Sequence, residues 1–261
     1  MGISGTKEWA TEDFAIQRGC ENGCSYCWAK ANALRFKQIK TPEEWLKPVI
    51  NEAKVNKKWR KHEGRVFFPS THDITPLNIR ECIITLIHIL GAGNEVLIVS
   101  KPRLGVIKHL CFALQDYNAQ ILFRFTIGSN SDSVLKFWEP FAPSYLERKD
   151  SLKYAFEKGF ETSVSSEPYL DENIGEVIED LKPFVSDALW LGKMNRIKER
   201  VDTTGWDPAQ FAHLDRVRRC QTDAAIHTLY EHFKNDPKVK FKDSIKKVVG
   251  LPELKKIGED V

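Results

Sequence analysis

Short apolar segments alternate with amphipathic segments along most of the chain. The apolar segments have the length and composition of buried strands, at 14–19, 65–70, 95–100, 119–129, 160–166 and 186–194. Segments with helical periodicity lie between them, at 28–37, 41–55, 77–90, 103–117, 143–159 and 171–183. Helix-start residues support two of these helices. Thr41 precedes Pro42 in one, and Ser144 stands three residues before Glu147 in the other.

The alternation of six strands with helices indicates parallel strands joined by right-handed crossovers. Six units are too few to close an eight-unit barrel. The predicted fold class is therefore α/β, a partial (β/α)6 TIM-like barrel with a C-terminal helical extension. In barrels of this kind, functional residues gather on the loops that follow the C-terminal ends of the strands.

The strand–helix alternation stops near residue 195. We therefore divide the chain into a barrel core at 1–195 and a C-terminal helical extension at 196–261, and we expect both to form one domain. The extension contains a segment with basic and apolar helical faces at 215–234 and a lysine-rich tail after it.

The composition is that of a globular protein, with 42% hydrophobic and 29% charged residues in a chain of 261. The net charge of +3 is too small to predict nucleic-acid binding from charge alone. No apolar run is long enough to span a membrane, and the first residues lack the apolar core of a secretory signal. These features favour a cytoplasmic protein, in which clustered cysteines more often bind metal than form disulfides.

Three cysteines follow the first predicted strand, in the stretch RGCENGCSYCWAK. Cys20, Cys24 and Cys27 have the spacing C-x3-C-x2-C. A structural zinc site needs four closed ligands, for which His62 or Cys82 would be a distant fourth. An electron carrier of the ferredoxin type needs a fourth cysteine. Three thiolates instead suit a cubane iron–sulfur cluster with one iron left open to a small molecule.

This motif, with Tyr26 directly before its last cysteine, resembles that of the radical S-adenosylmethionine superfamily. The resemblance implies a partial (β/α)6 barrel and a [4Fe-4S] cluster on Cys20, Cys24 and Cys27, whose open iron binds S-adenosylmethionine. It further implies reductive cleavage of that cofactor to a 5′-deoxyadenosyl radical, which abstracts a hydrogen atom from a substrate. An electron donor such as flavodoxin or ferredoxin is implied as a partner.

Further segments resemble the branch that contains spore photoproduct lyase. They are STHDITP after the second strand, VSKPR after the third, and the run from LKFWEP to SSEP through the fifth. The resemblance covers about residues 14–192 and implies a nucleic-acid base or lesion as the substrate. The cysteine that donates hydrogen in that enzyme aligns with no position here.

Four candidate cofactor ligands follow the later strands. Lys101, after the third strand, matches a family lysine that meets the cofactor carboxylate. Ser129, after the fourth, is a candidate for the carboxylate or the ribose. Ser165 and Glu167, at the end of the fifth, are candidates for the ribose hydroxyls. The alternatives are a surface lysine and a turn serine.

The loop after the second strand and the residues around the last cysteine supply the other candidates. Thr71 and Asp73 lie where many relatives have glycines that contact the cofactor ammonium, so we expect a side-chain contact instead. His72 between them is a candidate proton carrier, and helix capping is the plainer account of this loop. Tyr26 or Trp28 is expected near the adenine, although Trp28 equally suits the core.

The other cysteines have structural interpretations. Cys82 and Cys111 lie on apolar helix faces, where cysteine behaves as a small hydrophobic residue, and Cys220 follows a basic run on a more exposed helix. Glu139 and Arg148 are interpreted as an ion pair or as two solvated side chains.

Three function classes remain open on the sequence. The first is an enzyme acting on a nucleic-acid base or lesion, which the basic tail at 238–247 also favours. The second is an enzyme acting on a peptide or small metabolite. The third is a non-catalytic iron–sulfur protein.

Overall fold

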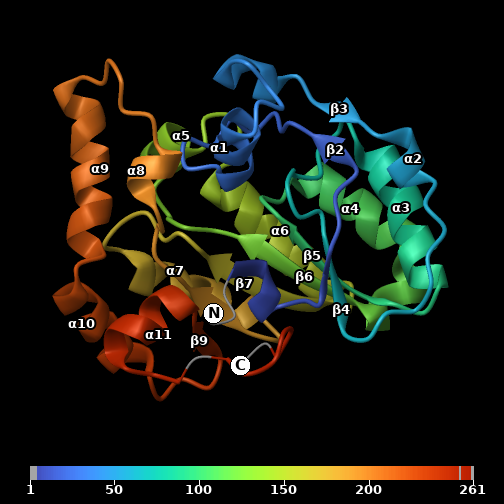
Figure 1. Ribbon diagram of the computed structural model, residues 1–261. Coiled ribbons are helices and arrows are strands. Elements are labelled where there is room, and N and C mark those ends of the chain that lie inside the picture. Colours follow the sequence, from blue (N-terminus) through green and yellow to red (C-terminus); the bar gives the residue numbers. More distant parts are fainter. Residues whose placement is uncertain (1–4, 253, 260–261) are drawn as a thin grey trace.

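The computed structural model describes residues 5–252 and 254–259 (Figure 1). Within these residues, seven strands form one parallel sheet in the order β1-β4-β5-β6-β7-β8-β9, with β1 and β9 at its two edges. The strands of the sheet are β1 (Glu12–Asp13), β4 (Arg65–Phe68), β5 (Glu95–Ser100), β6 (Ile121–Thr126), β7 (Glu161–Ser166), β8 (Leu189–Leu191) and β9 (Val239–Phe241). A separate antiparallel pair joins β2 (Gln17–Arg18) to β3 (Val49–Ile50).

Helices connect the strands and pack mainly against one face of the sheet (Figure 1). The α-helices are α1 (Trp28–Arg35), α2 (Glu52–Val55), α3 (Ile79–Gly91), α4 (Leu104–Ala113), α5 (Asp132–Trp138), α6 (Tyr145–Glu157), α7 (Ile174–Leu181), α8 (Ile197–Arg200), α9 (Pro208–Cys220), α10 (Asp223–Phe233) and α11 (Asp243–Val249). The short 3-10 helices are η1 (Gly5–Glu8), η2 (Pro42–Leu46), η3 (Gln115–Gln120) and η4 (Lys182–Phe184). No helix among the described residues is long and apolar enough to cross a membrane.

The strands bury both faces because their side chains alternate between two cores. In β4, Val66 and Phe68 join the large core under the helices, whereas Phe67 points to the other face. On that inner face Phe67 packs with Trp9 and Trp190, so the segment before β1 covers the concave side of the sheet. An open parallel sheet with helices on its outer face is the predicted α/β partial barrel.

Most of the predicted strands are confirmed, and the first one is displaced. The first strand of the parallel sheet, β1, begins two residues before the predicted segment 14–19. The later part of that segment forms β2, which lies outside the parallel sheet. Backbone bonds still tie Phe14 to the sheet, because its N–H donates to Phe67 and its carbonyl accepts from Ser70. The apolar segment therefore enters the sheet and then turns away from it.

The single helix predicted at 41–55 is wrong. The segment instead forms η2, β3 and the one-turn α2. The hydroxyl of Thr41 makes no capping bond, and Pro48 lies where a continuous helix would need an N–H donor. Pro42 does begin a turn of helical geometry, but that turn is the 3-10 helix η2, which ends at Leu46.

The C-terminal segment contributes a strand as well as helices. The lysine-rich tail contains β9, which pairs with β8 and extends the sheet. The segment predicted as one helix at 215–234 is divided into α9 and α10, since the Thr222 hydroxyl accepts from the N–H of Ala225 and starts a new helix. The division of the chain at residue 195 stays a prediction.

Candidate active site

The three motif cysteines lie in one loop between β2 and α1. Gly19 begins this loop with φ of +91°, and a Cβ there would lie 2.7 Å from the carbonyl oxygen of Trp45. The N–H of Cys20 donates to that same carbonyl at 2.8 Å. Cys27 ends the loop as the N-cap of α1, where its sulfur accepts from the N–H of Lys30 at 3.4 Å. Glycine at position 19 thus lets the loop pass close to η2.

The loop brings the three thiols within electrostatic range of one another. Cys24 is buried, and Cys20 and Cys27 are partly exposed. Burial raises the pKa of the Cys20 thiol to about 12 and raises that of Cys24 further. Among the described residues, no group of three or more His, Cys, Asp or Glu side chains is arranged around a single metal ion. In a cubane cluster each thiolate binds a different iron, so the thiolates need not converge on one point.

Asp73 holds the cysteine loop against the ends of two strands. Its buried carboxylate accepts from the side-chain amide of Asn22 in the cysteine loop at 2.8 Å. It also accepts from the Ser100 hydroxyl and from the N–H groups of Lys101 and Ile74, at 3.1 Å each to Oδ1. These bonds use the carboxylate for positioning the loop, which leaves it little capacity for a bound molecule. The predicted cofactor contact of Asp73 stays a prediction.

Lys101 follows β5 directly, and its side chain is 13% exposed. Its ammonium lies 3.9 Å from the carboxylate of Glu139 and 5.7 Å from the centre of the Tyr26 ring. Burial alone would lower the pKa of this ammonium, but the facing groups of Cys24, Tyr26, Glu139 and Asp73 hold it well above its ordinary value. Within the described residues the ammonium has no hydrogen-bond partner, so a charged donor beside Cys24 remains available.

Glu139 and Arg148 form the predicted ion pair, and both side chains are fully buried. The Arg148 guanidinium lies 2.5 Å from the Glu139 carboxylate, which also accepts from the Tyr26 hydroxyl. Burial raises the pKa of Glu139, but Arg148 and Lys101 outweigh it and keep that pKa below its ordinary value. The alternative of two solvated side chains is therefore wrong. The pair fixes Tyr26 next to the last cysteine.

The three candidates from the later strands have different surroundings. The Ser129 hydroxyl is buried and donates to Asp171, so its hydrogen is committed within the protein. Ser165 is buried in β7, in register with Trp190 of the inner face. Glu167 follows β7, and its carboxylate lies 3.6 Å from the ammonium of Lys242. Their predicted contacts with the cofactor stay predictions.

Arg200 is a candidate that the sequence did not reveal. It ends α8, which packs against α1, and its Nε is buried without a hydrogen-bond partner among the described residues. Burial lowers the pKa of its guanidinium, and the nearby Glu167 and Cys27 partly offset this. A one-turn helix in a segment without periodicity gave no signal, and only the fold brings this arginine to the cysteine loop.

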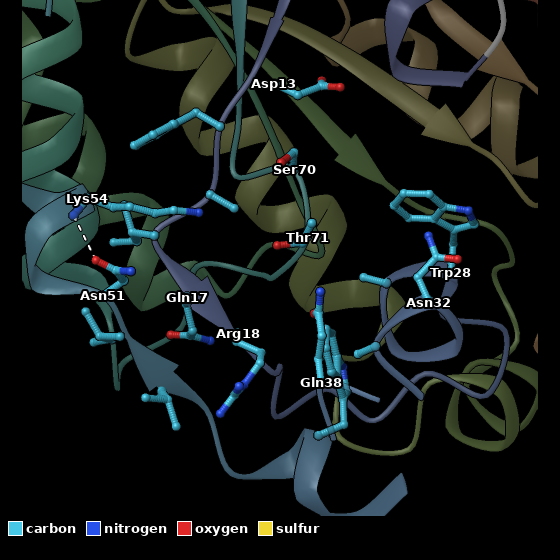
Figure 2. Close-up of a pocket in the computed structure, with 18 of the residues that line it drawn as sticks. Asp13, Gln17, Arg18, Trp28, Asn32, Gln38, Asn51, Lys54, Ser70 and Thr71 are labelled. Carbon is cyan, nitrogen blue, oxygen red and sulfur yellow. Dashed lines mark hydrogen bonds between the residues drawn. The ribbon is translucent and has the colours of Figure 1, made fainter. Parts of the chain in front are cut away.

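A pocket of about 740 Å³ flanks the motif on the side of α1. Figure 2 shows Trp28 and Asn32 on one side of it, Gln17 and Arg18 facing them, and Thr71 between. Trp28 is 50% exposed, which excludes the core alternative for its side chain. Two predicted residues, Trp28 and Thr71, therefore line a pocket.

His72 does not open onto this pocket. Burial lowers its pKa to about 4, and its ring nitrogens contact the backbone of Asp73 and Ile16. A neutral, buried imidazole held in this way stabilises the loop. Helix capping, the alternative for this loop, is not what these residues do, because the N-cap of α3 is Asn78 and no side chain makes a capping bond there.

The lysines of the C-terminal tail are largely used inside the protein. Lys242 and Lys246 are buried, and the ammonium of Lys238 donates to the carbonyl of Val185 at 2.7 Å. Lys247 pairs with Asp243 at 3.3 Å. This tail therefore offers little of the free basic surface that the sequence suggested for nucleic acid.

Comparison with known proteins gives a family and a fold. The sequence model of the Radical SAM superfamily matches residues 14–183. A spore photoproduct lyase mutant with bound AdoMet and dinucleoside spore photoproduct has a TM-score of 0.52 and 15% identity, over 88% of this chain and 75% of that chain. Streptococcus suis SuiB bound to S-adenosylmethionine has a TM-score of 0.50 and 12% identity, over 90% of this chain and 50% of that one. The comparison with curated proteins gave no match.

At these identities the two solved structures establish a common fold, the open parallel barrel described above. The family match is independent of them, because it rests on sequence over more than half of the chain and includes the cysteine loop. The chain therefore belongs to the radical SAM superfamily, and its cofactors are those of the superfamily, a [4Fe-4S] cluster and S-adenosylmethionine.

Proposed function

We propose that Cys20, Cys24 and Cys27 bind the [4Fe-4S] cluster and that the enzyme abstracts hydrogen from a nucleobase-containing substrate. An electron donor such as flavodoxin or ferredoxin supplies the reducing electron. When bound, the cluster and S-adenosylmethionine together supply a 5′-deoxyadenosyl radical as the hydrogen-abstracting species. The protein's own residues hold these groups, balance their charge and exclude water.

The observation that carries the proposal is the pairing of thiols with cations. The three thiols share one loop, Lys101 faces Cys24, and Arg200 lies near Cys27. Thiolate ligands bring negative charge into a largely buried place, which costs free energy unless cations lie close by. This donor set fits a cluster with three protein ligands.

The same cations are suited to the cofactor. S-adenosylmethionine carries a carboxylate, and Lys101 has an ammonium without a hydrogen-bond partner among the described residues. Arg200, which lies near Cys27, offers a buried Nε without a hydrogen-bond partner among the described residues. Ser165 in β7 and Glu167 directly after it are our candidates for the ribose hydroxyls. The assignments of Lys101, Ser165 and Glu167 follow from position at strand ends, and those of Lys101 and Arg200 from charge.

The fold likeness to spore photoproduct lyase supports a nucleobase substrate. The inward lysines of the C-terminal tail favour a second candidate, a free nucleotide or other small metabolite, over a long duplex. Duplex binding takes several basic side chains aligned with the phosphates.

Anaerobic reconstitution tests the proposal. We expect about four irons per chain in the wild-type protein, as a cubane cluster requires. Replacing any one of Cys20, Cys24 or Cys27 by alanine should remove most of that iron, whereas Cys220→Ala, outside the motif, should retain it. With dithionite, the wild-type protein should convert S-adenosylmethionine to 5′-deoxyadenosine. Full iron in the triple-alanine variant, or zinc in the native protein, would contradict the cluster assignment.

A further inference from the structure

The pocket beside the cysteine loop has a wall made by one face of α1. Trp28, Asn32 and Phe36 are spaced four residues apart and all line the pocket. Trp28 is 50% exposed and Phe36 is 64% exposed, so both rings present apolar surface to the pocket instead of to the core. A helix that turns two aromatic rings toward a pocket offers flat surfaces on which a planar group stacks.

The polar side chains of the pocket differ in whether they are bonded within the protein, and they include the charged Asp13 and Lys54. Gln17 and Asn51 are committed, because Gln17 bonds Gly19 and Asn78 and Asn51 caps α2. Arg18, Asn32 and Gln38 are among those with no side-chain hydrogen-bond partner in the part of the chain that the structure describes. Two free amides and one free guanidinium therefore accompany the two rings.

This combination matches one chemical class. Aromatic rings stack on nucleobases, side-chain amides pair with the donor and acceptor edges of bases, and a guanidinium binds phosphate. The volume of about 740 Å³ is in the range of pockets that enclose small ligands. The pocket also adjoins the motif, since Trp28 follows Cys27, and Thr71 lies two residues before Asp73, which bonds Asn22 of the cysteine loop.

We propose that this pocket binds one unpaired nucleotide of the substrate, with its base against Trp28 and Phe36 and its phosphate at Arg18. The amides of Asn32 and Gln38 contact the base edge. This inference rests on the proposed function and names the place where its substrate binds. Free nucleotides and single-stranded nucleic acid share this chemistry, and the experiment separates them.

The test measures binding to the reconstituted protein with S-adenosylmethionine at saturation, so that adenine probes do not compete for the cofactor site. The probes are the four ribonucleosides, their 5′-monophosphates, and short single-stranded DNA and RNA with a fluorescent label. We expect Trp28→Ala to weaken binding of the bound probes about 5- to 100-fold, as the loss of one stacking surface does. Phe112→Ala is the matched control, because Phe112 is an 86% exposed ring on α4, outside the pocket.

Arg18→Ala gives a second, independent readout. This substitution should lower the affinity for the monophosphates and the oligonucleotides but not for the nucleosides. It should also make the affinity depend less on salt concentration. Trp28→Leu keeps an apolar side chain next to Cys27, so it separates loss of stacking from disturbance of the loop. Iron content and affinity for S-adenosylmethionine, measured on each variant, report whether the motif is intact.

Each outcome decides the proposal. Binding of oligonucleotides alone assigns the pocket to nucleic acid, and binding of monophosphates assigns it to a metabolite; both support a nucleotide pocket. The proposal is overturned if no probe binds at millimolar concentration or if Trp28→Ala leaves every affinity unchanged. It is also overturned if Trp28→Ala weakens only S-adenosylmethionine, because the indole would then serve the cofactor adenine. If the wild-type protein did not cleave the cofactor, the proposed function would be contradicted. The measured affinities would still decide whether the pocket binds a nucleotide.

Discussion

Two lysines, Lys242 fully buried and Lys101 13% exposed, occupy equivalent places in the fold and differ in what surrounds them. Lys101 directly follows β5, and Lys242 directly follows β9, so both lie at the C-terminal edge of the parallel sheet. The Lys242 ammonium lies 2.8 Å from the Glu8 carboxylate and donates to the carbonyl of Gly5 at 2.9 Å. The Lys101 ammonium lies 3.9 Å from the carboxylate of Glu139, and this carboxylate is already paired with Arg148.

The difference separates a structural lysine from one available to a ligand. Lys242 also lies 3.8 Å from the centre of the Trp9 ring, so it joins the N-terminal segment to the last strand. The Lys101 ammonium makes only a long contact with Glu139, at 3.9 Å, and it faces Cys24 and Tyr26 in the cysteine loop. An equal position in a strand–loop unit therefore does not imply an equal role.

Removing Lys242 should have the largest effect on stability. Lys242→Ala leaves the Glu8 carboxylate buried without its cation, and loss of one partner of a buried pair costs about 3–5 kcal/mol. Urea denaturation should show this fall in the free energy of unfolding. Lys101→Ala serves as the comparison and should cost clearly less. Equal losses in the two variants would remove the distinction between the two lysines.

Lys101→Ala should instead weaken the binding of S-adenosylmethionine. A charge-assisted hydrogen bond contributes about 1.5–3 kcal/mol, which corresponds to roughly a ten- to hundred-fold loss of affinity. Calorimetry and iron colorimetry on the same sample measure this, and the iron content should be unchanged. Lys101→Arg should restore the affinity only in part, because the guanidinium differs in size and shape. Unchanged affinity in Lys101→Ala would exclude Lys101 from the cofactor site.

The free energy of unfolding should depend on pH through Glu8, the carboxyl group that faces Lys242. Burial raises the pKa of Glu8 from 4.5 to about 7, although Lys242 acts against this. A raised pKa stabilises the fold at low pH, and this stabilisation is lost as the pH rises toward and through about 7. Between pH 8 and pH 6 the protein should gain about 1–1.5 kcal/mol from this group. Glu8→Gln should remove that part of the pH dependence in parallel urea titrations; an identical profile in the variant would refute it.

Replacing Arg200 should have the smallest effect of these substitutions, and the effect should be on the affinity for S-adenosylmethionine. Arg200→Ala is expected to weaken S-adenosylmethionine binding about two- to ten-fold, since a partly exposed arginine contributes less than a buried ammonium. The matched control is Arg196→Ala on the same helix turn, where the guanidinium is 55% exposed and pairs with Glu199. Equal affinities in the two variants would show that Arg200 acts only in packing α8 against α1.

The sequence alone predicted the repeating part of this protein. The strands β4 to β8 and the helices α3, α4 and α6 were predicted from apolar runs, periodicity and caps, and Ser144 caps α6 as expected. These signals are local, because a buried strand and an amphipathic helix each carry their pattern within a few residues. The cysteine motif is local too, and its spacing was sufficient to predict the superfamily that the family match confirms.

The tertiary structure decided everything that depends on which distant segments meet. The lysine-rich tail was interpreted as a basic segment that favours nucleic acid, yet it contains β9, which pairs with β8 as the last strand of the sheet. Lys101 and Lys242 look alike in sequence, and only the fold places Glu8 beside one and leaves the other beside Cys24. Arg200 reaches the cysteine loop through the packing of α8 on α1. The physical reason is that burial and charge pairing are properties of contacts between segments far apart in the chain, and no local pattern of residues encodes them.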